Sequence, residues 1–195
     1  MKVNIITLST FFAASFLFIQ CVEESGYKKY KKLVDEEMST GARVDSLFFD
    51  FHFGMTSKEF YAECWKKNKQ EMFTDGAGNT AVQYKMKNEL KYPTSMNFYP
   101  GFNQGKISKM GVSFQYDGWA PWNKHLSSDS LQQDVLRLFK GWYPEGNPFI
   151  TINDDKRGPL YIKVDKNRRI IIGRYDDAYV KVDYTDLTVE KEEMK

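Results

Sequence analysis

Hydrophobic and polar residues alternate along several short stretches of this chain, a pattern typical of half-buried β-strands. The first stretch covers residues 47–53 and is followed directly by Gly54. Later stretches of the same kind are separated by turn-forming residues, among them Pro93 and Gly101. They predict strands over residues 81–86, 95–99, 107–116, 149–152, 160–164, 169–174 and 179–184.

Two stretches instead repeat hydrophobic residues at helical spacing. The first begins at Thr56, which forms a capping box with Glu59, a typical start of a helix. The residues expected on the core face of this helix are Phe60, Tyr61, Cys64, Trp65 and Asn68. A second helix is expected over residues 128–142. Its apolar stripe consists of Leu131, Val135, Leu138, Phe139 and Trp142.

The predicted order of elements is one strand, a helix, three strands, a second helix and four strands. Because helices do not separate every strand, this order favours an α+β fold over a parallel α/β fold. The expected architecture is an antiparallel sheet with two helices packed on one face. The segments that start at Thr56 and Ser127 have the same order of elements, so the fold also allows a tandem helix–three-strand repeat.

The N-terminal residues 1–20 are expected to be a signal peptide. Lys2 supplies a positive charge, and residues 11–19 are apolar apart from Ser15. This apolar run is short for a membrane span, which needs roughly 20 residues. An uncleaved anchor helix is the alternative interpretation.

Cys21 stands where this apolar run ends. Residues 18–21 resemble the lipobox of bacterial lipoproteins, in which the cysteine is acylated and the chain is cleaved before it. Phe18 and Gln20 depart from the leucine and the small residue of that motif. The acidic pair at 23–24 resembles the surface-export signal of Bacteroidota lipoproteins. The resemblance implies a lipid anchor in the outer membrane, on its periplasmic or its surface side; an ordinary secreted protein is the alternative.

The following segment, residues 21–43, is mostly charged and polar and predicts a lipid-anchored tether, either extended or as a short frayed helix. Four lysines at 28–32 offer a contact with anionic lipids, although the acidic residues beside them favour a solvated surface. A single globular domain is expected over residues 44–188, and residues 189–195 form a charged tail.

Composition excludes several classes of function. The 195 residues contain 28 Lys+Arg and 26 Asp+Glu, and the formal net charge of +2 lacks the basic excess of a nucleic-acid-binding domain. Two cysteines and two histidines do not favour a disulfide framework or a zinc site. The chain contains neither a G-x-S-x-G nor an H-E-x-x-H motif. No catalytic residue, metal ligand or cofactor is therefore predicted.

The tripeptide Gly54-Met55-Thr56 stands before a helix and an antiparallel sheet. This arrangement resembles the opening of the SmpA/OmlA (BamE) lipoproteins and of β-lactamase-inhibitor-protein-like modules. The resemblance covers a short segment together with the order of elements. It implies a binding or assembly protein rather than an enzyme.

Aromatic residues are dense where the strand predicted over 107–116 ends. Tyr116, Trp119 and Trp122 lie within seven residues, and Ala120-Pro121 stiffens the loop between the two tryptophans. Rigid exposed rings can stack on sugars or anchor a partner protein, whereas buried rings would fill the end of the core. We expect Trp122 to be mostly buried against the second helix and Trp119 to be more exposed.

These features predict a non-enzymatic envelope or cell-surface lipoprotein that acts as a binding or assembly module. Its expected contacts are the membrane, through the anchor at Cys21, and an unidentified protein or glycan. A glycan-binding module that uses Trp119, Trp122 and Tyr116 is the alternative. A hydrolase with unidentified carboxylates is the third interpretation.

Overall fold

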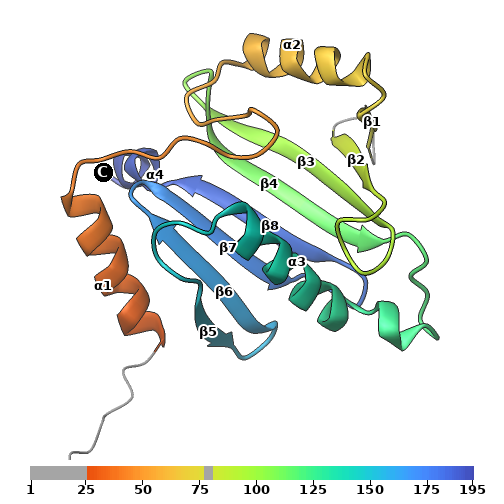
Figure 1. Cartoon of the computed structure of the whole chain (residues 1–195). Helices are drawn as coiled ribbons and strands as arrows, with labels where there is room; N and C mark the ends of the chain where they lie inside the picture. The colour runs from red at the N-terminus through yellow and green to blue at the C-terminus, as the bar shows by residue number, and fades with distance from the viewer. Residues whose placement is uncertain (1–25, 77–80) are drawn as a thin grey trace, which may run out of the picture.

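The computed structural model describes residues 26–76 and 81–195. Within these ranges the strands form one eight-stranded antiparallel sheet in the order β1-β2-β3-β4-β8-β7-β6-β5 (Figure 1). The strands are β1 (Phe73–Asp75), β2 (Val82–Met86), β3 (Thr94–Asn103), β4 (Lys106–Tyr116), β5 (Ile150–Asp154), β6 (Gly158–Asp165), β7 (Arg168–Arg174) and β8 (Val180–Asp186). The sheet and its helices confirm the predicted α+β fold.

Each half of the sheet, as far as the structure describes it, is a helix followed by a meander of strands. Helix α2 (Ser57–Asn68) precedes β1–β4, and α3 (Ser128–Trp142) precedes β5–β8. The two meanders join through their last strands, because β4 pairs with β8. The observed unit is longer than the predicted helix–three-strand unit, since the short strand β1 was not anticipated. The remaining helical elements are α1 (Gly26–Ser39), η2 (Lys124–Leu126) and α4 (Leu187–Glu193).

The main hydrophobic core lies between α2, α3 and one face of the sheet. Figure 1 shows α3 lying across β7 and β8. Its residues Leu131, Val135 and Phe139 are fully buried, as the helical spacing predicted, whereas Leu138 is only half-buried. The capping box of α2 is also confirmed: the Thr56 hydroxyl accepts from the Glu59 amide, and the Glu59 carboxylate accepts from the Thr56 amide.

The strand predicted over residues 47–53 is not formed. Phe49 and Asp50 have φ angles of +51° and +70°, so the backbone turns where a strand would continue. The Leu47 amide donates to the Phe51 carbonyl, which closes the turn at 2.9 Å. Leu47, Phe51 and Phe53 are buried, as the alternating pattern predicted. Phe48, on the other side of the predicted strand, is also buried, whereas Phe49 is only half-buried, because the chain turns here.

The segment predicted as a tether instead contains helix α1, which packs against the sheet. Residues 21–43 were predicted to space the domain from the membrane, yet Tyr30, Leu33, Val34 and Met38 pack against a second buried cluster on β5 and β6. This cluster lies on the sheet face opposite α3. The predicted tail likewise contains most of α4.

Residues 1–20, which were predicted to be a signal peptide, and Cys21 lie outside the described residues. In the described part of the chain, no helix has the length and apolarity that crossing a membrane requires.

Several outward-facing side chains of β2, β3 and β4 are accessible to solvent, although Ser95 on the same face is only 7% exposed. We call this surface the open face. Its members alternate with core residues along the strands and form two cross-strand pairs, Asn97 with Gln83 on one side and with Ser113 on the other. The open face comprises Gln83, Asn97, Gly111, Ser113 and Gln115, all exposed or half-exposed.

Candidate functional site

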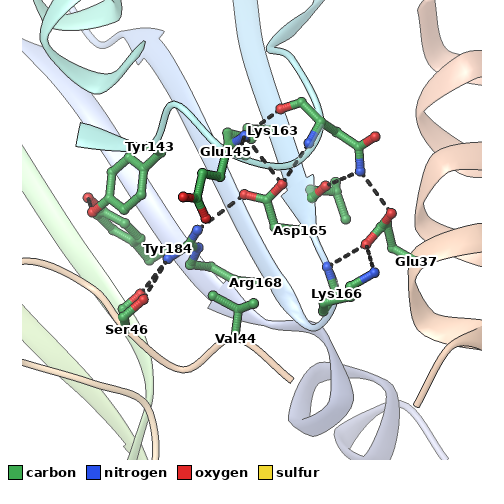
Figure 2. Close-up of polar contacts among 12 residues, drawn as sticks. Glu37, Val44, Ser46, Tyr143, Glu145, Lys163, Asp165, Lys166, Arg168 and Tyr184 are labelled. Carbon is green, nitrogen blue, oxygen red and sulfur yellow. Dashed lines mark hydrogen bonds and ion pairs between the residues drawn. The ribbon is translucent and has the colours of Figure 1, made fainter. Parts of the chain in front are cut away.

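A network of polar side chains is buried below the loop that follows α3 (Figure 2). At its centre is Lys163, which is only 2% exposed. Its ammonium group donates to the carbonyl of Glu145 at 2.6 Å and to the carbonyl of Asn147, and forms an ion pair with Asp165 at 3.3 Å. The three donor positions of the ammonium group are therefore matched by three acceptors.

Arg168 extends this cluster toward the turn at residues 47–51. Its guanidinium donates to Asp165 at 3.1 Å and to the Ser46 carbonyl at 2.7 Å, and it stacks over the Tyr143 ring. The Tyr143 hydroxyl donates to the Leu47 carbonyl at 2.9 Å. Burial raises the pKa of Tyr143 to about 12, so this phenol stays protonated at neutral pH.

Glu37 connects α1 to the same region. Its carboxylate accepts from the side-chain amide of Asn147 at 2.9 Å and from the backbone amide of Lys166 at 2.8 Å. Figure 2 shows Glu37 reaching from the helix toward Lys166 at the β6–β7 turn. Polar atoms in this cluster mostly bond to one another, which indicates a role in holding α1, the loop and the sheet together rather than in chemistry on a ligand.

A pocket of about 760 Å³ lies at the end of the sheet where β4 stops. Trp119 lines it, and the indole N–H donates to the Asp177 carbonyl at 3.1 Å. This bond fixes the ring between the β4–α3 loop and the β7–β8 turn. We call this the Trp119 pocket; its other lining residues include Gln115, Asn123, Lys124, Asp129, Asp176 and Tyr179.

The three predicted ligand-binding aromatics have different surroundings. Trp119 is half-buried, whereas Trp122 is 81% exposed, which reverses the expected order of burial. Trp122 does not line the pocket. Tyr116 is buried, and its hydroxyl donates to Asp134 of α3 at 2.7 Å. Tyr116 is therefore part of the core and not of a ligand surface.

Carboxylates at the Trp119 pocket have structural partners. One oxygen of Asp176 accepts from the amides of Ala178 and Tyr179, both at 2.8 Å, which stabilises the β7–β8 turn. Asp129 forms an ion pair with Arg174. A glycosidase needs two carboxyl groups free to act on the same bond. Asp176 and Asp129 have these partners in the fold, but the Asp129 side chain is 73% exposed and Asp177 also lines the pocket.

A second aromatic hollow, of about 390 Å³, lies between α2, β1 and β3. Three exposed rings line it: Tyr61 (51% exposed), Trp65 (64%) and Tyr99 (42%). The Tyr61 and Tyr99 hydroxyls share a hydrogen bond of 3.0 Å. We call this the α2 groove. Asn68, Thr74 and Asp75 add polar groups to its wall.

The α2 groove was missed because Tyr61 and Trp65 were assigned to the core face of their helix. The buried face of α2 is instead centred on Phe60, with Lys67 beside it. Cys64 is half-buried at the groove, and burial raises the pKa of its thiol to about 12, with a smaller contribution from Glu63. The thiol therefore stays protonated at neutral pH.

In residues 26–76 and 81–195, no three histidine, cysteine, aspartate or glutamate side chains come close enough together to hold a metal ion. No protein-family model, curated protein or solved structure matches the chain.

Proposed function

We propose that the protein is a lipid-anchored, non-enzymatic module of the cell envelope that binds a glycan in the Trp119 pocket. The observation that carries this proposal is the fixed orientation of Trp119, whose ring borders an open pocket while its N–H is held by Asp177. A ring that is already ordered loses little conformational entropy on binding. Its apolar face can pack against a sugar ring.

Polar groups around the indole support the same ligand class. Gln115 and Asn123 supply amide donors and acceptors, and Tyr179 supplies a hydroxyl. Sites that recognise small polar ligands combine aromatic walls with a few such groups.

The experiment that tests glycan binding is affinity electrophoresis of the full chain through gels containing xylan, mannan or β-glucan. We expect at least one of these polysaccharides to retard the protein. Trp119→Ala should abolish the retardation, and Trp119→Phe should retain part of it because a ring face remains. Trp122→Ala is the matched control, since Trp122 is exposed and outside the pocket. Equal retardation of Trp119→Ala and wild type, or no retardation in any gel, would refute the proposal.

The anchor is tested separately by Cys21→Ser. Acylation of Cys21 would hold the protein in the membrane fraction through several acyl chains, whereas a single chain binds only marginally. We expect the variant to move to the soluble fraction, with the wild type remaining membrane-bound in the same preparation. Continued membrane retention of the variant with residues 1–20 still attached would instead support the uncleaved anchor helix.

A further inference from the structure

We infer that the Trp119 pocket and the α2 groove are the two ends of one binding track, which crosses the open face and takes a linear, uncharged oligosaccharide. This inference rests on the proposed function and names its substrate class and the extent of its site. The inference does not follow from either hollow by itself. It follows from the register of the strands between the two hollows.

The register places one lining residue of each hollow, Tyr99 and Gln115, on the open face. Along β3, Tyr99 and Asn97 point outward, alternating with the core residue Phe98. Tyr99 lines the α2 groove. Ser95 lies two residues before Asn97 on β3 and faces the same side. It pairs with Gln115 on β4. Gln115 in turn lines the Trp119 pocket.

The surface between the two ends consists of amides and small residues. Gln83 donates to the side-chain oxygen of Asn97 at 3.1 Å, which leaves further amide positions available for a ligand. Gly111 and Ser113 on β4 are small residues, so no large side chain projects from the neighbouring surface. A sugar chain presents hydroxyl groups along its edges, and such a ladder of amides can bond to them without a deep cavity.

Charges on this face favour a neutral ligand. Lys85 pairs with Asp117 at 3.1 Å at the end near Gln115, so the two opposite charges offset each other there. On β8 the cation of Lys181 has the carboxylate of Asp183 two positions away on the same face. The face therefore has no excess of either sign among these four groups. An acidic polysaccharide or a nucleic acid would find no basic surface here.

The length of the bound oligosaccharide distinguishes a continuous track from an isolated pocket. Four residues of β3 separate the level of Tyr99 from that of Gln115, a distance of about 14 Å along the strand. A disaccharide in the Trp119 pocket would not reach Tyr99 or Trp65. A hexasaccharide would span the open face and stack on those rings.

The test is calorimetric titration of the full chain, purified in a detergent without a sugar headgroup, with xylohexaose, mannohexaose and cellohexaose and with the matching disaccharides. We expect one hexasaccharide to bind about tenfold or more tightly than its disaccharide. Trp65→Ala and Tyr99→Ala should each weaken hexasaccharide binding several-fold and leave disaccharide binding unchanged. Tyr27→Ala is the control, an exposed ring on α1 that lines neither hollow.

The outcomes separate this inference from the proposed function. Equal affinity for both lengths, or hexasaccharide binding unaffected by both Trp65→Ala and Tyr99→Ala, would overturn the track while a Trp119-dependent site stands. Absence of binding by every saccharide, or binding that survives Trp119→Ala, would overturn the proposed function and the track with it. Because Trp65 is largely exposed, its replacement remains informative even if Tyr99→Ala fails to fold.

Discussion

Two lysine–aspartate pairs of similar length serve opposite regions of this sheet. Lys163 and Asp165 are 3.3 Å apart, with side chains 2% and 8% exposed. Lys85 and Asp117 are 3.1 Å apart, with side chains 49% and 37% exposed. The first pair lies in the buried cluster of Figure 2, and the second borders the open face. Burial, and not the pairing itself, is the difference between them.

The comparison separates polar groups that build the fold from those that are available to a ligand. In the buried cluster, the carbonyls of the loop after α3 complete the bonding of Lys163, so a ligand would have to break existing bonds. On the open face, Asn97 and Gln115 keep partly exposed amides. A ligand hydroxyl that reproduces the hydrogen bonds of water can replace it at such solvent-exposed amides.

The largest expected effect is the loss of stability on replacing Asp165 with alanine. The change leaves Lys163 and Arg168 buried without their shared carboxylate, and breaking a buried pair in this way costs about 3–5 kcal/mol. The measurement is urea denaturation followed by tryptophan fluorescence. Asp117→Ala is the matched control and should cost no more than about 1 kcal/mol, the range for exposed pairs. Equal losses for the two variants would show that the buried cluster does not hold the fold.

Gly146→Ala should give the next largest loss. Gly146 has a φ of +75°, and an added Cβ would collide with the Asp165 carboxylate. Left-handed strain together with the displaced carboxylate should cost about 2–4 kcal/mol. Gly105→Ala isolates the first contribution, because Gly105 has a φ of +76° and nothing within 4 Å of the added carbon. Coinciding denaturation curves for the two variants would contradict the close contact between Gly146 and the Asp165 carboxylate.

Much of this fold is predictable from local pattern. Helix α3 was predicted over the residues it occupies, and the capping box placed the start of α2. Prediction fails where local and tertiary preferences compete. Phe49 and Asp50 turn the chain inside an alternating pattern, and α1 is held mainly by β5, β6 and the Glu37 contacts, which lie far away in sequence.

The candidate site was predictable only in part. Aromatic density directed attention to Trp119, but the same density included the core residue Tyr116, because periodicity does not distinguish a ring that caps a sheet from one that lines a pocket. The α2 groove depends on register: Tyr99 meets Tyr61 only because β3 runs beyond the end of β2. No spacing within one segment contains that information.

A smaller effect is expected from the pH dependence of the α1 contact. Burial alone would raise the pKa of Glu37, but hydrogen bonds from Lys166 and Asn147 lower it below the ordinary value of 4.5. A lowered folded-state pKa stabilises the protein above 4.5, and this contribution is lost as pH falls through the folded pKa. Urea denaturation should therefore show a stability gap between wild type and Glu37→Gln that is full at neutral pH and closes in acid.

Glu36→Gln controls for the general effect of removing a negative charge from α1. The Glu36 side chain is exposed and lies 3.8 Å from Lys32, so its replacement should change stability little at any pH. A gap between wild type and Glu37→Gln that stays constant below 4.5 would mean that the Glu37 carboxylate does not hold the helix.

The smallest expected effect concerns the pair that borders the open face. Lys85 donates to Ser95 at 2.5 Å as well as to Asp117, yet both charged groups are well solvated. A double-mutant cycle with Lys85→Ala and Asp117→Ala should give a coupling energy of about 0.2–1 kcal/mol. The coupling should fall further at high salt, because exposed charges are screened. A coupling above about 2 kcal/mol would place this pair with the buried cluster, and the open face would then be a rigid part of the fold and not a surface poised for a ligand.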